Sequence, residues 1–114
     1  MELDTIQVAR KIEGCIKSLE KLCAELDGIG DEKVNAEVEY DKEYEIALTL
    51  LNSEGVPVTT QRKKAEGILA RNGVKERLGL ADIRYKALHT KIDAAKSALN
   101  GWQSYNRHLS TTVL

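Results

Sequence analysis

The sequence predicts an all-α protein, a helical hairpin or a three-to-four-helix bundle built on a long C-terminal helix that resembles a coiled-coil strand. Apolar residues recur every three or four positions through most of the chain, as on one face of a helix. Only one of the 114 residues is proline, and 31% are charged. Because a chain of this length suits one domain, we expect a single helical domain over residues 1–114.

The first helix is expected over about residues 5–26, with Asp4 or Thr5 as its N-terminal cap. Steps of three or four residues predict the following buried stripe: Ile6, Ala9, Ile12, Ile16, Leu19, Cys23 and Leu26. Cys15 and Leu22 widen this stripe. The segment DGIGD at 27–31 is expected to end the helix, because its glycines can adopt a positive φ.

A second helix is expected over about residues 31–52, within a stretch (20–54) that holds eleven acidic and three basic residues. Its predicted buried face contains Tyr40, Tyr44, Ala47, Leu48 and Leu51. The predicted opposite face is acidic and contains Glu37, Glu39, Asp41, Glu43 and Glu45. Such a face is usually only a solvated surface, but a row of carboxylates could also imitate a DNA backbone and bind a basic groove of a partner protein.

The segment SEGVPVTT at 53–60 predicts a break, because Gly55 and Pro57 interrupt helices. A short helix is expected over about residues 60–72, in a stretch (55–77) with six basic and two acidic residues. Its candidate phosphate contacts are Arg62, Lys63, Lys64, Arg71, Lys75 and Arg77. Three interpretations stay open for these cations: they face the acidic helix of the same chain, they bind nucleic acid, or they bind an acidic partner.

The last helix is expected over about residues 74–109, a rod of roughly 50 Å. Its apolar seam has a 3.5-residue period and contains Leu78, Ala81, Tyr85, Leu88, Ile92, Ala95, Leu99, Trp102, Asn106 and Leu109. Two helices of about 22 residues must pack end to end to cover such a seam, or another chain must cover part of it. We expect a homo-oligomer, a dimer, with these seam residues at its interface: Leu88, Ile92, Leu99, Trp102 and Leu109.

The sequence contains no phosphate-binding glycine motif and no nucleophile motif, so we expect no enzymatic activity and no cofactor. His89 and Asp93 stand four residues apart, but two ligands do not make a metal site, so none is expected. Cys15 and Cys23 would lie about 12 Å apart on one helix and are expected to be free thiols in a reducing cytoplasm. We expect neither a membrane span nor a secretory signal.

Two segments, EYEIALTLLNSEGVPVT and ILARNGVKERLGLADIRYKALHTKIDAAKSALNGWQSYNRHL, carry a resemblance over about residues 40–109. They have a helix with Tyr and Ala, a Gly-x-Pro-x-Thr break and a long helix with a Tyr-Lys-Ala segment. In these features the chain resembles small helical proteins of tailed phages and prophages, whose genes often lie near recombination genes. The resemblance implies a phage setting in a bacterial cytoplasm and supplies no catalytic residues.

These observations together predict a non-enzymatic, phage-type interaction protein. We expect it to bind and inhibit a host protein complex of defence or DNA processing through its helical surfaces. One alternative is a DNA-binding accessory of phage recombination that uses residues 61–77. The other alternative is a small-ligand binder, for a nucleotide, at a subunit interface. A membrane partner is not expected.

Overall fold

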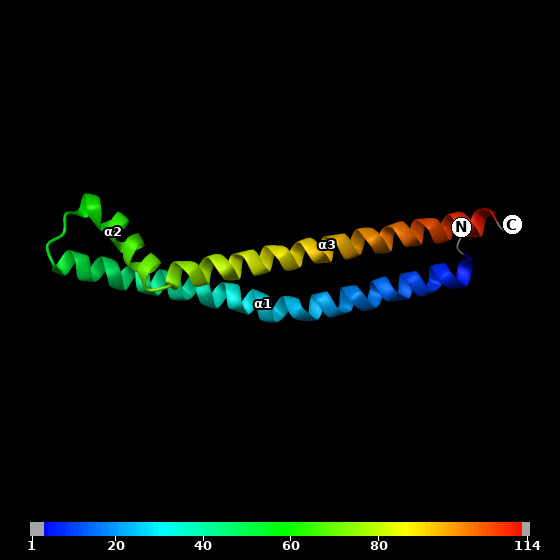
Figure 1. The fold of residues 1–114 in the computed structure, drawn as a ribbon, viewed down its shortest axis with the longest axis horizontal. Coiled ribbons are helices and arrows are strands. Elements are labelled where there is room, and N and C mark those ends of the chain that lie inside the picture. Colours follow the sequence, from blue (N-terminus) through cyan, green and yellow to red (C-terminus); the bar gives the residue numbers. More distant parts are fainter. Residues whose placement is uncertain (1–3, 113–114) are drawn as a thin grey trace. The chain divides into compact units, whose positions relative to one another are not determined.

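The computed structural model describes residues 4–112, which form three α-helices (Figure 1). These are α1 (Thr5–Ser53), α2 (Val58–Arg71) and α3 (Val74–Thr112). Among the described residues there is no β-strand. The predicted all-α class, with a long C-terminal helix, is therefore confirmed.

Helix α1 begins with a capping box. The Asp4 carboxylate accepts a hydrogen bond from the Gln7 amide at 2.8 Å, and the Gln7 side-chain oxygen accepts one from the Asp4 amide at 3.0 Å. Each residue satisfies an amide that the first helical turn leaves without a backbone partner. Of the two caps that the sequence suggests, the structure uses Asp4.

The predicted break at residues 27–31 is wrong, because α1 continues through this segment as one helix of 49 residues. Gly28 and Gly30 do not adopt a positive φ. A glycine in a helix costs about 1 kcal/mol relative to alanine, which weakens a helix without ending it. Packing of the residues on both sides outweighs this cost, since most helical stability in proteins comes from tertiary contacts.

The chain does turn at two other glycines, Gly55 and Gly73, with φ values of 78° and 83°. The amide of Val56 donates to the Leu51 carbonyl at 3.0 Å, and the amide of Gly55 donates to the Asn52 carbonyl at 3.1 Å. This is the Schellman pattern, which requires a left-handed residue after the helix. The break predicted near Gly55 is confirmed, and Gly73 separates the helices expected over about residues 60–72 and 74–109.

The contacts divide the chain into two compact units, residues 28–85 and residues 1–27 with 86–114. In the first unit, α2 packs on the last part of α1 and the beginning of α3. Its core contains Ala47, Leu51, Ala65, Leu69 and Val74, with Tyr40, Tyr44, Leu48, Val56 and Ile68 packed against them. All five residues of the predicted buried face at 40–51 take part in this core. The expectation of a single domain stays a prediction.

In the second unit, the beginning of α1 and the end of α3 run antiparallel, side by side (Figure 1). Val8, Leu88 and Ile92 are its buried apolar residues among those described. Along this part of α1 the inward positions follow alternating steps of four and three: Val8, Ile12, Cys15, Leu19, Leu22 and Leu26. The predicted stripe is therefore right at Ile12, Leu19 and Leu26.

The same stripe is wrong at four positions, whose side chains are exposed: Ile6, Ala9, Ile16 and Cys23. The buried face instead includes Cys15 and Leu22, which we had expected only to widen the stripe. The physical reason is the heptad period of a helix that pairs with one neighbour over a long distance. On such a helix only two positions in seven face the neighbour, and Ile16 and Cys23 each stand one residue beyond such a position.

Candidate functional site

Three ion pairs join α1 to α3 in the unit of residues 28–85. Lys33 lies 3.6 Å from Asp82, and Arg84 lies 3.7 Å from Glu32. The Nε of Arg77 donates to Oε1 of Glu39 at 3.1 Å, and its Nη2 donates to the same oxygen. The hydrogen bond with Glu39 raises the pKa of Arg77 above its usual value. Arg77 is thus engaged within the chain, as the intramolecular interpretation of the basic stretch predicts.

The predicted acidic face is divided between two sides of α1. A step of two residues advances about 200° around a helix, so alternate residues cannot share one face. Glu37, Asp41 and Glu45 lie on one side and are exposed, whereas Glu39 and Glu43 lie on the other and are half-buried. No continuous row of five carboxylates forms, and the interpretation of residues 37–45 as a single acidic surface is corrected.

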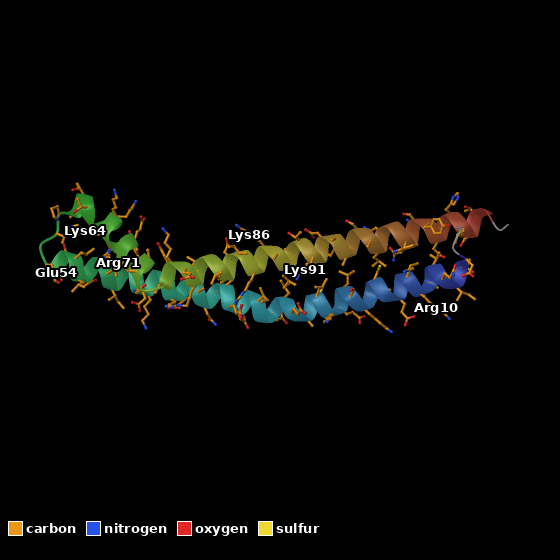
Figure 2. The ribbon with its side chains drawn as sticks, in the orientation of Figure 1. Arg10, Glu54, Lys64, Arg71, Lys86 and Lys91 are labelled. Carbon is orange, nitrogen blue, oxygen red and sulfur yellow. The ribbon has the colours of Figure 1, made fainter. Side chains whose placement is uncertain are left out.

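Helix α2 carries a groove of about 610 Å³ that collects half of the predicted basic residues. Lys63, Lys64 and Arg71 line it, and their side chains are exposed. Within residues 4–112 these three cations form no ion pair and no side-chain hydrogen bond. Figure 2 shows Lys64 and Arg71 on this helix. The groove therefore presents three unpaired positive charges from a single short helix.

The other predicted cations lie elsewhere. Arg62 precedes Arg71 by nine residues, which is about two and a half helical turns, so the two point to opposite sides of α2. Lys75 belongs to the first turn of α3 and lines a different groove, together with Lys33, Glu37 and Asp82. The six predicted contacts are thus divided into a cluster of three, two separate cations and the paired Arg77.

The groove also contains residues that the sequence analysis did not select. Thr59, Thr60, Gly67 and Ile68 come from α2, and Leu51 comes from α1. At Gly67 a Cβ would lie 3.7 Å from Nη1 of Arg71, so the guanidinium lies across this glycine. The signal was present in the spacing of Thr60, Lys64, Gly67 and Arg71, which follows the steps of four, three and four that mark one helical face.

The predicted subunit seam is covered within the chain. Leu88 and Ile92 are 5% and 4% exposed, and Leu99, Trp102 and Leu109 are half-buried. The shortage of helix that led to the expected dimer does not exist, because α1 has 49 residues and is not two helices of about 22. The shortage of helix therefore no longer supports an interface at these five residues, and their place between subunits stays a prediction. Self-association of the protein stays a prediction.

Trp102 instead forms one wall of a groove of about 440 Å³ in the unit of residues 1–27 and 86–114. The Trp102 ring meets Tyr105 edge-on, with centroids 6.2 Å apart. Arg10, Lys11, Gly14, Cys15 and Ser18 of α1 and Ala95 and Ala98 of α3 complete the lining. This groove combines small side chains with one aromatic ring and two cations, Arg10 and Lys11, against the three cations of the α2 groove.

No metal-binding cluster of three or more His, Cys, Asp or Glu side chains is found in the described part of the chain. Cys15 and Cys23 are free cysteines, as expected. Over residues 4–112, none of the helices has the apolar length that a membrane crossing requires. The groove of α2 is therefore the strongest candidate site that the described residues present.

Comparisons with known proteins do not add a relationship. No protein-family model matches the chain, and no curated protein and no solved structure matches it.

Proposed function

We propose that this protein is a non-enzymatic, phage-type nucleic-acid-binding protein that contacts phosphates through the groove of α2. This corresponds to the first alternative of the sequence analysis, a DNA-binding accessory of phage recombination in a bacterial cytoplasm. One observation carries it: Lys63, Lys64 and Arg71 surround one groove and have no ion-pair partner among the described residues.

The contrast with the neighbouring charges supports this proposal. In the same unit Lys33, Arg77 and Arg84 each bind a carboxylate of another helix, which neutralises them. The three groove cations keep their full charge for an external anion. Lysine and arginine that neutralise phosphates release condensed counterions, and this release supplies most of the affinity of non-specific nucleic-acid binding.

The position of α2 gives these cations a rigid base. Ala65 and Leu69 are 0% exposed and anchor the helix in the core, on the side away from Lys63 and Lys64. The first turn of α2, with Thr59 and Thr60, has no side-chain cap. The positive end of the helix dipole therefore adds to the positive potential of the groove.

A matched pair of triple variants tests the proposal. We expect K63A/K64A/R71A to lose affinity for a 20-base-pair duplex about a hundredfold or more at 50 mM salt, because three phosphate contacts are removed. The control R62A/K42A/K75A removes the same charge from exposed positions outside the groove and should lose much less. Fluorescence anisotropy measures both affinities, and circular dichroism checks the helix content.

The salt dependence gives an independent measurement. For three phosphate contacts, the logarithm of the binding constant should fall with the logarithm of salt concentration with a slope of about −2.7. The absence of binding by the intact protein at 50 mM salt would exclude the proposal. Equal losses in the two triple variants would show that the groove has no special role.

The expected protein partner remains a second candidate, on a different surface. Val34, Val38, Asp41 and Glu45 follow steps of four, three and four on one side of α1, and the two valines are 56% and 60% exposed. A mixed apolar and acidic strip is suited to a basic protein surface. If the protein inhibits a host complex through this strip, D41K/E45K should relieve inhibition, whereas K63A/K64A/R71A should leave it unchanged.

A further inference from the structure

Resting on the proposed function, we infer that the α2 groove recognises the phosphate backbone of double-stranded nucleic acid and does not distinguish base sequences. The groove cations alone do not settle the form of nucleic acid. Three further features of the same unit favour one form: the absence of aromatic rings at the groove, the engagement of Gln61 and Thr60 within the protein, and the fixed positions of the groove cations on one helix.

The groove has no surface on which an unpaired base could stack. Helix α2 contains no aromatic residue, and none lines the groove. Tyr40 and Tyr44 of the same unit stack on each other, with centroids 6.2 Å apart, and pack against the core. Proteins that bind single strands combine a cationic groove with exposed aromatic rings, because stacking supplies much of their affinity. The groove therefore has the cations that bind a single strand but lacks the aromatic rings on which its bases would stack.

Two polar side chains of α2 that could read base edges, those of Gln61 and Thr60, are used inside the protein. Gln61 is 9% exposed, and its Nε2 donates to the Val56 carbonyl at 2.8 Å and to Oδ1 of Asn52 at 3.3 Å. The Thr60 hydroxyl donates to the Pro57 carbonyl at 3.1 Å. Glutamine is a principal reader of adenine in the major groove, and here it is unavailable. Contacts to phosphates alone position a protein on nucleic acid without reading its sequence.

The fixed positions of the charges favour a rigid backbone. Lys64 and Arg71 are seven residues apart on one face of α2, which corresponds to about 10.5 Å along the helix axis. A duplex holds its phosphates in fixed positions, whereas a single strand must be ordered to present them, which costs conformational entropy.

Four probes test the inference on the intact protein at 50 mM salt: an AT-rich 20-base-pair duplex, a GC-rich duplex of the same length, a dT20 strand and poly-glutamate. We expect the two duplexes to bind with affinities within about threefold of each other, since every phosphate is equivalent. We expect the dT20 strand and poly-glutamate to bind at least about threefold more weakly than either duplex. The variant K63R/K64R, which keeps both charges, should bind the duplexes as the intact protein does.

The opposite results are distinguishable from a failure of the proposed function. A difference above about threefold between the duplexes would overturn sequence independence. Binding of dT20 within about threefold of the duplexes, or tighter, would overturn the preference for double strands while leaving nucleic-acid binding intact. Equally tight binding of poly-glutamate would show that the groove accepts acidic proteins as well. Absence of binding to all four probes would instead exclude the proposed function itself.

Discussion

Among the described residues, Gln61 is the one polar residue that is buried. It lies on the inner face of α2 beside Ala65 and Leu69, where an apolar residue would be usual. Its amide joins the beginning of α2 to the turn that precedes it, through the Val56 carbonyl, and to the end of α1, through Asn52. A buried polar group of this kind must be hydrogen-bonded, and its removal leaves the partner unsatisfied.

We therefore expect Gln61→Ala to lower the free energy of unfolding by about 1–3 kcal/mol, because the Val56 carbonyl loses its side-chain donor in a partly buried site. Asn52→Ala is the matched control. It removes only the longer of the two hydrogen bonds, at 3.3 Å, from an exposed side chain, and should cost less. Urea unfolding followed by circular dichroism measures both. Equal costs for the two variants would contradict the importance of the Val56 contact.

At the scale of the element, the continuity of α1 has a direct experimental consequence. Gly28 and Gly30 are helical, and a Cβ built at either position would meet no atom within 4 Å. Alanine stabilises a helix interior by about 0.5–1 kcal/mol relative to glycine. We expect Gly28→Ala and Gly30→Ala together to raise the free energy of unfolding by about 1–2 kcal/mol. If the segment formed a turn with positive φ, the same double variant would be destabilising.

Gly73 provides the opposite case and serves as the comparison for this experiment. Its φ of 83° is a conformation that alanine rarely adopts, and a Cβ would lie 3.2 Å from Nη1 of Arg77. We expect Gly73→Ala to lower the free energy of unfolding by about 1–2 kcal/mol, because a left-handed conformation costs about that much for a residue with a side chain. Thermal or urea unfolding would detect the change, and a neutral effect would contradict a strained turn between α2 and α3.

At the scale of the whole molecule, each compact unit brings together segments that are remote in the sequence. Residues 28–85 bring α2 onto α1 and α3, and residues 1–27 meet residues 86–114. Leu88 is 5% exposed in the second of these units. We expect Leu88→Ala to lower the free energy of unfolding by about 2–5 kcal/mol, the cost of a cavity in a packed core.

The same variant separates a core from a subunit interface. Because Leu88 is buried within the chain, its replacement should change stability and leave the mass of the folded protein unchanged in light scattering. If the replacement lowered the mass of the folded protein, Leu88 would lie at an interface between subunits. For the intact protein, a single species of 12.7 kDa would contradict the predicted self-association.

The sequence by itself determined the helical class, the start of the first helix at Asp4 or Thr5 and the turn near Gly55. Hydrophobic periodicity and the special φ of glycine are local properties, so they can be read from neighbouring residues. The seam of α3 was also predictable, because every one of its ten residues, from Leu78 to Leu109, is buried or half-buried.

Only the tertiary structure decided that α1 runs through residues 27–31, since contacts with other segments outweigh the glycine propensity there. It also decided which face of α1 is buried. As one long helix, α1 packs against the apolar seam of α3, which the sequence analysis had expected a second subunit to cover. Finally, it decided which cations are free. Arg77 and Arg71 look equivalent in the sequence, but Glu39 lies opposite only Arg77, and the charge of Arg71 remains available at the groove. Pairing between distant charges depends on the fold, which local patterns do not contain.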